Sequence, residues 1–303
     1  MDAYHIEVYM ISSKKVYSTY FKEYVLDGKT LEQLHRELLQ ILVDIKEYCD
    51  EQNIDYMVGG GTLLGTVRHK GFIPWDDDID IMMTRENYIK FSKGFSEYFS
   101  DKYLLVEPLS PGYYCKMPKI YKKNTTYIEI SNAGLDSYNM LFVDVFILEN
   151  VPSPGIKRTI RAKIYDIAYK GASVCVDYLY PSPVIENKAV ANKEVAEYYK
   201  FRRKLGKLFT IFGGIKFYLK ICEKLAKYNH STNWIGCPSG ISYEREILPS
   251  HVYQEIEEGE FCGVKVKIPK QYDIYLKNLY GNDYMQIPPL EKREYHVAYK
   301  IEF

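Results

Sequence analysis

One stretch, between Val58 and Met83, constrains the fold of this chain more than any other. An apolar run at residues 54–58 predicts a strand, and the three glycines that follow it predict a tight turn. Residues 62–68 then have the pattern of a short helix. Glycines at the start of a helix let backbone N–H groups approach a phosphate, and the helix terminus adds positive potential. The stretch therefore predicts a phosphate-binding turn between a strand and a helix.

The same stretch continues into an acidic strand, predicted at residues 78–82. Side chains two residues apart share one face of a strand, so Asp78 and Asp80 are expected together, with Ile79 and Ile81 in the core. Two neighbouring carboxylates repel each other unless a cation lies between them. Their oxygens suit Mg²⁺ or Mn²⁺, metals that also hold substrate phosphates. The phosphate-binding turn is therefore expected to lie beside a divalent-metal site.

The run Asp76-x-Asp78-x-Asp80 also matches the start of a calcium-binding loop. Such a loop needs glycine at its sixth position and glutamate at its twelfth, where this chain has Ile81 and Asn87. A glycine-rich turn alone, or an acidic run alone, is common in ordinary connections. Their occurrence together at short range favours a catalytic metal site over a calcium loop.

A third carboxylate, Asp144, stands alone in the apolar run of residues 141–148. Burying an unpaired carboxylate is costly, so this one needs a partner. A buried lysine or arginine is one possible partner. Because of the Asp78 and Asp80 pair, the favoured interpretation is that Asp144 also faces the metal.

Several motifs together are similar to the signature of the LicD family of phosphotransferases. The motifs are Gly-Gly-Thr-Leu-Leu-Gly-x-x-Arg-His-x-Gly-Phe-Ile-Pro-Trp-Asp-Asp-Asp-Ile-Asp-Ile from residue 60, Phe-Val-Asp-Val-Phe at 142–146, and Tyr-Gly-Asn-Asp-Tyr-Met-Gln-Ile-Pro-Pro at 280–289. Glu291-Lys292-Arg293 and His296 follow. The resemblance spans about residues 30–150 and 230–303, and it extends more distantly to fukutin-related transferases. It implies an α+β fold with a nucleotidyltransferase-like core, a mixed sheet flanked by helices.

The resemblance also implies an activity. Phosphocholine, or a related alcohol phosphate, is expected to pass from CDP-choline or another CDP-alcohol to a hydroxyl of a cell-surface glycan precursor, free or lipid-linked. Lipopolysaccharide and teichoic acid are glycans of this kind. Asp78, Asp80 and Asp144 are assigned as catalytic residues that hold one or two Mg²⁺ or Mn²⁺ ions on the donor phosphates. One of them, preferably Asp144, is expected to take the proton of the acceptor.

Residues around the turn are candidates for binding substrate. Gly60, Gly61 and Thr62 are expected to hold a phosphate through backbone N–H and hydroxyl groups. Arg68 is expected to pair with a phosphate, or else with Asp76 or Asp77 in a salt bridge.

Further candidates have two interpretations each, one functional and one structural. His69 is a phosphate ligand or a structural histidine, and Trp75 stacks on a base or sugar or packs in the core. Asp76 either coordinates the metal or orients the residues that do. Weaker candidates for phosphate binding are Lys119 and Lys122. Arg293 and His296 are implied by the resemblance alone.

Other functions are compatible with part of this pattern. An Asp-x-Asp motif occurs in metal-dependent glycosyltransferases, and the same core could transfer a nucleotide from an NTP. An inactive scaffold that binds a nucleotide or glycan is a further alternative. The glycine turn directly before the carboxylates disfavours the glycosyltransferase, and the retention of all three carboxylates disfavours the scaffold.

The composition changes after residue 154. Residues 155–228 contain 16 Lys and Arg against 6 Asp and Glu, a net charge of +10 in a chain whose total is zero. Amphipathic helical patterns fill this segment. We therefore expect a catalytic core at 1–154, a basic helical insert or subdomain at 155–228, and the C-terminal part of the catalytic domain at 229–303.

The basic segment has three possible interpretations: a solvated face, a contact with an anionic membrane, or a site for a phosphate-bearing acceptor. Nucleic acid is not expected, because the overall charge is balanced and no recognised motif occurs. The six cysteines form no Cys-x-x-Cys pair, the first residues do not resemble a signal peptide, and no apolar run approaches about 20 residues. The expected location is the cytoplasm, either free or peripheral at the inner face of the cell membrane.

Four other predictions concern local structure. Residues 30–53 have the pattern of a long helix, and residues 1–27 that of a strand or hairpin. Residues 113–121 and 125–130 are expected to pair as a hairpin. A single strand is expected at 261–268.

Overall fold

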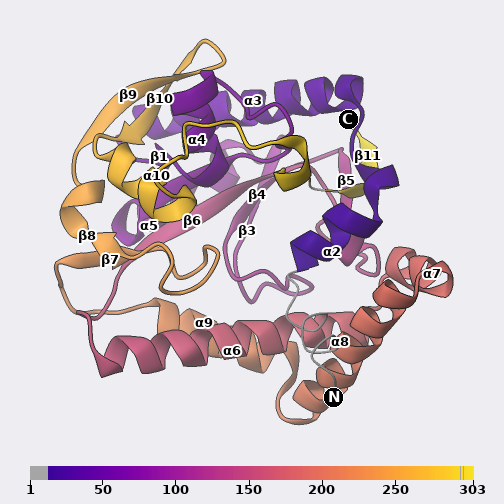
Figure 1. The fold of residues 1–303 in the computed structure, drawn as a ribbon. Helices are drawn as coiled ribbons and strands as arrows, with labels where there is room; N and C mark the ends of the chain where they lie inside the picture. Colours follow the sequence, from indigo (N-terminus) through magenta and orange to yellow (C-terminus); the bar gives the residue numbers. More distant parts are fainter. Residues whose placement is uncertain (1–12, 294, 296) are drawn as a thin grey trace.

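The computed structural model describes residues 13–293, 295 and 297–303. A mixed sheet lies at the centre of the upper part of the molecule, and a layer of helices runs beneath it (Figure 1). Five strands of the sheet are ordered β1 (Met57–Val58), β2 (Asp80–Thr84), β6 (Phe142–Asn150), β4 (Lys119–Lys122) and β3 (Tyr103–Val106). β2 and β6 are parallel, and the other neighbouring strands are antiparallel. The fold therefore mixes α and β structure, as expected.

The predicted long helix is confirmed as α3 (Gly28–Glu51). Asp27 caps it, because its carboxylate accepts a hydrogen bond from the Thr30 N–H at 2.9 Å. Its apolar face, which includes Leu34 and Ile41, is buried in the main core. The other helices around the sheet are α4 (Gly60–His69), α5 (Arg85–Tyr98) and α10 (Tyr272–Tyr280).

Two predictions of local pairing were wrong. β4 does not form a hairpin with β5 (Thr126–Glu129): both edges of β4 are occupied by β3 and β6, and β5 pairs with β11 (Ala298–Glu302). The single strand predicted at 261–268 is instead the hairpin of β9 (Ile256–Phe261) and β10 (Val264–Pro269). Its two-residue turn is possible because Cys262 and Gly263 have positive φ angles of 51° and 79°.

The N-terminal segment is helical where the structure describes it. Residues 13–24 form α2 (Ser13–Tyr20) and the short 3₁₀ helix η1 (Lys22–Tyr24), and residues 1–12 of the predicted strand or hairpin lie outside the described residues. Val16 and Phe21 are buried in a small core that they share with helices of the lower layer. Tertiary packing therefore determines the conformation of this tyrosine-rich segment.

The lower layer consists of α6 (Ile156–Leu179), α7 (Pro183–Ala191), α8 (Lys193–Ile211) and α9 (Gly214–Ala226) (Figure 1). The segment 155–228 is thus helical, as its pattern predicted. Its core includes Tyr165 and Leu219, together with Val151 and Tyr243 from outside the segment. The last two strands, β7 (Trp234–Gly236) and β8 (Leu248–Pro249), extend the sheet from β6. Within the described chain, every helix is too short or too polar to cross a bilayer.

Candidate functional site

The glycine turn brings two carboxylates against the backbone at the start of α4. Gly60 has a φ of 48°, a conformation that residues with side chains adopt only at a cost. A Cβ atom at Gly60 would overlap the carboxylate of Asp80, and one at Gly61 would lie 2.5 Å from the Asp76 Oδ2 atom. The glycines are therefore required where Asp80 and Asp76 approach the chain.

Two groups of the predicted phosphate cradle already have partners in the protein. The Gly60 N–H donates to the hydroxyl of Tyr275 at 3.2 Å, and that hydroxyl donates to the buried carboxylate of Glu246 at 3.0 Å. The hydroxyl of Thr62 is buried and accepts from the Asp80 N–H at 2.8 Å. These contacts join α10 and β2 to the start of α4. A phosphate would have to replace them to use either group.

Consecutive aspartates form an acidic cluster just before β2. Asp76, Asp77 and Asp78 each place one carboxylate oxygen within 4.8 Å of the others. Asp77 is buried, and the hydroxyl of Tyr127 donates to it. Oxygen ligands at this spacing fit a hard divalent cation such as Mg²⁺. Asp77 was not predicted as a ligand, although three successive aspartates were a visible signal.

Asp78 lies before β2 and not within it, because the strand begins at Asp80. Burial nevertheless alternates as predicted: Ile79 and Ile81 are fully buried, while the two aspartates are partly exposed. Asp78 and Asp80 therefore both face away from the core.

Asp144 lies beside Asp80 in the sheet. The two residues are paired in register between the parallel strands β6 and β2, which places their side chains on the same face. The Nζ atom of Lys119 lies 2.9 Å from the Asp144 Oδ1 atom, and both side chains are buried. Burial raises the pKa of the Asp144 carboxyl, and the neighbouring ammonium group opposes that rise. The contact that the structure shows is thus the buried lysine, the less favoured of the two interpretations.

The two lysine candidates are engaged in different places. Lys119 lies in the interior with Asp144, and its ammonium group is 3.3 Å from the centre of the Phe142 ring. Lys122 pairs with Glu37 of α3. Neither lysine is presented to a phosphate in this arrangement.

Arg68 connects the signature stretch to the C-terminal loop. Its Nη1 group donates to the carbonyl oxygens of Tyr284 at 2.7 Å and Gln286 at 3.1 Å, and its Nε group donates to His69 at 2.9 Å. Burial lowers the pKa of Arg68 and of His69, and the charge of Arg68 lowers that of His69 further. His69 is therefore held as a neutral acceptor beside the guanidinium group.

Trp75 is partly buried against the main core, and one of its faces is already covered. The Arg293 guanidinium lies 4.1 Å from the centre of the Trp75 ring, and the His69 ring meets it edge-on at 6.4 Å. Arg293 and Arg68 together hold the segment that follows α10 against the signature stretch. His296, the other residue implied by the resemblance, lies outside the described residues.

Other residues near the acidic cluster were not predicted. Tyr280 is 39% exposed overall, but desolvation around its hydroxyl raises its pKa, and the carboxylates of Asp80, Asp76 and Asp78 raise that pKa further. His35 of α3 lies with its Nε2 atom 2.7 Å from the carbonyl oxygen of Asp76. Tyr280 begins the C-terminal motif, which was a usable signal for it. His35 belongs to an amphipathic helix, and the pattern of that helix does not indicate that His35 lies near the acidic cluster.

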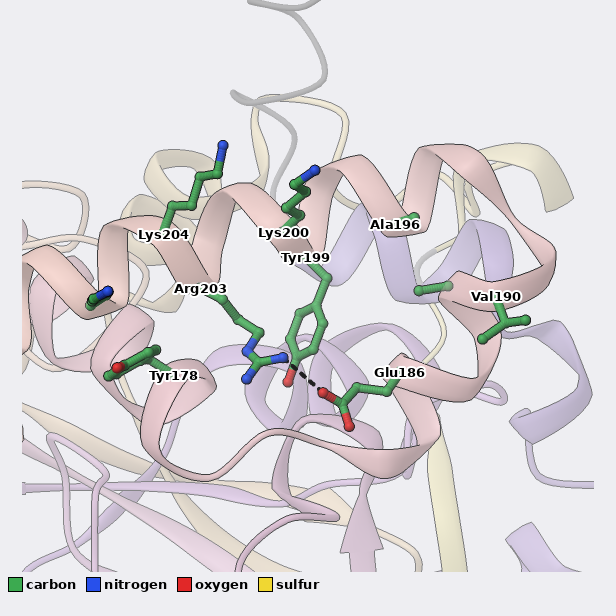
Figure 2. A pocket seen from close by; sticks show the side chains of 10 residues that line it. Tyr178, Glu186, Val190, Ala196, Tyr199, Lys200, Arg203 and Lys204 are labelled. Atoms are coloured by element: carbon green, nitrogen blue, oxygen red, sulfur yellow. Dashed lines mark hydrogen bonds and ion pairs between the residues drawn. The ribbon is translucent and has the colours of Figure 1, made fainter.

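A separate cavity of about 500 Å³ lies in the helical layer, between α7 and α8. Figure 2 shows Arg203 paired with Glu186 on its wall, while Lys200 and Lys204 extend from α8. None of the aspartates of the acidic cluster lines this cavity. It is therefore a basic hollow distinct from the site at the glycine turn.

The chain is similar to one described family and to several known proteins. Residues 53–182 match the family described as "LicD/FKTN/FKRP, nucleotidyltransferase domain". The chain is 29% identical over 270 residues to the lipopolysaccharide cholinephosphotransferase LicD of Haemophilus influenzae, a match that covers 88% of this chain and 96% of that protein. An uncharacterised protein of Rickettsia typhi is 39% identical over 84 residues, which is 28% of this chain and 24% of that protein. A second, from Rickettsia prowazekii, is 43% identical over 68 residues, or 22% of this chain and 24% of that protein.

The family match contains the glycine turn, the acidic cluster and Asp144. The similarity to the Haemophilus enzyme extends over nearly the whole of both chains. The chain is therefore similar to the LicD family of phosphotransferases, through a family domain at residues 53–182 and through a relative matched over most of its length.

Proposed function

We propose that this enzyme transfers phosphocholine, or a related alcohol phosphate, from a CDP-alcohol to a hydroxyl of a glycan precursor. One observation carries the proposal: the carboxylates of Asp76, Asp77, Asp78 and Asp80 gather where α4 begins. The name of the Haemophilus relative supports phosphocholine as the group transferred and lipopolysaccharide as the acceptor.

The proposed metal site is centred on Asp78. Asp76 and Asp77 have oxygens close enough to share its cation, and Asp80 lies against the neighbouring turn. A bound Mg²⁺ or Mn²⁺ would neutralise charge on the donor phosphates. Lys119 contacts the Oδ1 atom of Asp144, so a metal would have to use the other carboxylate oxygen, and we propose Asp144 foremost as the residue that takes a proton.

In the proposed reaction, the bond between the transferred phosphorus and the CMP oxygen breaks as the acceptor oxygen attacks. The hydroxyl proton of the acceptor passes to a carboxylate oxygen of Asp144, and CMP leaves. Lys119, at 2.9 Å, favours the ionised form of Asp144 that can accept this proton. The side chains around the glycine turn orient the donor and the acceptor.

Other substrate contacts are proposed from the geometry. Arg68 and Arg293 hold the C-terminal segment near the turn, and Trp75 has one ring face against Arg293. A base or sugar that stacks on Trp75 would use its other face. A quaternary ammonium head group would be held by aromatic faces, because its nitrogen cannot donate hydrogen bonds.

We further propose that the sheet and its helices form a nucleotidyltransferase-like core, with residues 155–228 as a basic insert. The printed description of the matching family supports the core. The net charge of +10 in the insert supports a peripheral contact at the inner face of the cell membrane, where a lipid-linked acceptor would be presented.

The test is mass spectrometry of products formed with Mg²⁺ from CDP-choline, CDP-ribitol, CDP-glycerol, NTPs and sugar nucleotides, each offered with a panel of oligosaccharides. A product heavier by one phosphocholine, with release of CMP, is the expected result. If the enzyme used CDP-ribitol or CDP-glycerol in place of CDP-choline, its assignment as a phosphotransferase would stand and the assignment of its donor would change. Transfer of a nucleotide or of a sugar would contradict the proposal.

A further inference from the structure

Helix α6 has an apolar face that is exposed in the part of the chain that the structure describes. Four isoleucines, spaced by four, four and three residues, lie along one side of its first three turns. Ile156 is 79% exposed, Ile160 53%, Ile164 47% and Ile167 58%. Exposed apolar side chains are ordinary when they are scattered, but a continuous row of them marks a contact surface.

The same side of α6 is covered further along the helix. A Cβ atom at Gly171 would meet the ring of Phe209 from α8, and Tyr218 of α9 also contacts this position. Val174, one turn later, is buried, and Gly206 of α8 packs against its carbonyl oxygen. On this side of α6, the packing of α8 thus ends where the isoleucine row begins, whereas α9 continues along another side of the helix, where the Cys222 thiol donates to the Tyr165 carbonyl oxygen.

The end of α8, the turn that follows it and the first turn of α9 add a second group of exposed apolar side chains. Ile211 is 71% exposed, Phe212 70% and Phe217 48%. Because Phe209 and Tyr218 both flank Gly171, this turn lies beside the end of the row. In Figure 1, α6 and this turn lie together at the lower edge of the molecule. We call the four isoleucines and these three residues the isoleucine surface.

Exposed lysines frame the isoleucine surface. Lys163 and Lys170 flank the row on α6, and Lys207 and Lys216 stand on either side of the turn. Among the residues that the structure describes, no ion pair joins these four lysines to a carboxylate, whereas Arg202 of α8 is paired with Asp177. Their charge is therefore available to an anionic partner.

We propose that the isoleucine surface inserts into the interface of an anionic phospholipid bilayer, with the four lysines at the headgroup phosphates. An apolar row bordered by basic side chains is the arrangement of helices that lie in a membrane interface. A second copy of this chain is disfavoured, because a two-fold contact would bring the same lysine rims together. The inference deepens the membrane contact proposed above by naming its surface and adding an apolar contribution.

The experiment is flotation of the full chain with vesicles of phosphatidylcholine containing increasing amounts of phosphatidylglycerol. The double variant Ile160→Ser/Ile167→Ser and the single variant Phe212→Ser remove apolar contact. The matched control is Ile89→Ser/Val190→Ser, two exposed apolar residues outside the surface, 45% and 90% exposed. We expect the double variant to lose on the order of tenfold in vesicle binding, and the control to bind like the wild type.

A second variant separates the two contributions. Replacing the four lysines with glutamine should weaken the dependence on phosphatidylglycerol and salt while the fold, checked by thermal unfolding, stays intact. Absence of vesicle binding by the wild type would overturn the inference, as would equal binding by the isoleucine variant and its control. A dimer in solution that the isoleucine variant abolishes would assign the surface to a second copy instead.

The outcome is independent of the proposed reaction. The isoleucine variant should keep wild-type turnover with CDP-choline and a soluble oligosaccharide, because the surface contains none of the proposed site residues. Loss of flotation with normal turnover supports the surface. Normal flotation in a protein that never uses CDP-choline would refute the donor assignment and leave the surface standing.

Discussion

Replacing Gly60 with alanine tests whether glycine is required at this position because the Asp80 carboxylate lies against it. Two costs are expected. The φ angle of 48° is unfavourable for a residue with a Cβ atom by roughly 1–2 kcal/mol. The new methyl group would also overlap the Asp80 carboxylate, and overpacking of this kind costs about 1–3 kcal/mol. The free energy of unfolding should therefore fall by roughly 2–5 kcal/mol, or Asp80 should move and activity should be lost.

Two other glycines provide matched controls. Gly263 has a φ of 79° and open space around its Cβ position, so Gly263→Ala measures the backbone cost alone. Gly28 begins α3 with no atom within 4 Å of that position and no positive φ, so Gly28→Ala should be neutral or slightly stabilising.

Urea denaturation of the three variants gives the comparison, and turnover with CDP-choline is measured in parallel. The expected order of destabilisation is Gly60→Ala, then Gly263→Ala, then Gly28→Ala. If Gly60→Ala were no more destabilised than Gly263→Ala and kept full turnover, the close approach of Asp80 to the turn would be refuted.

Three further changes probe the acidic cluster and its surroundings. Asp78→Asn or Asp80→Asn should abolish turnover and leave the fold intact, with turnover and thermal unfolding as the measurements; wild-type turnover in a pure Asp80→Asn preparation would contradict the metal assignment. Lys119→Met should destabilise the protein by about 3–5 kcal/mol, because Asp144 would be left buried without its partner, and Lys119→Met/Asp144→Asn should recover part of that loss in urea denaturation. Tyr280→Phe should lower turnover while leaving the unfolding midpoint unchanged, since Tyr280 is partly exposed beside the aspartates; unchanged turnover would exclude a role in the reaction.

Local patterns predicted much of this structure. The helix at α3 follows from its apolar spacing and from polar groups at its start, and the short helix α4 follows directly from the glycines. The need of Asp144 for a polar partner was also predictable, because a lone carboxylate in an apolar strand is costly to bury, although the partner that the structure shows is Lys119. These features depend on residues that are close in sequence or on one strong physical requirement.

Contacts between distant residues were not predictable in the same way. Lys119 meets Asp144 because β4 lies beside β6 in the sheet. The expected hairpin of β4 with β5 gave no reason to predict that pairing. Thr62 and the Gly60 N–H resemble phosphate ligands in sequence, but their partners come from β2 and α10. Only the assembled sheet shows which polar groups are already used.

The central claim is that the acidic cluster holds a divalent cation during phosphocholine transfer. The most direct measurement is the release of CMP from CDP-choline, with a glycan acceptor, by enzyme that has been treated exhaustively with a chelator. We predict no release by the treated wild type, recovery when Mg²⁺ or Mn²⁺ is added back, and no recovery in Asp78→Asn. Full release without metal, or equal recovery in Asp78→Asn, would contradict the claim.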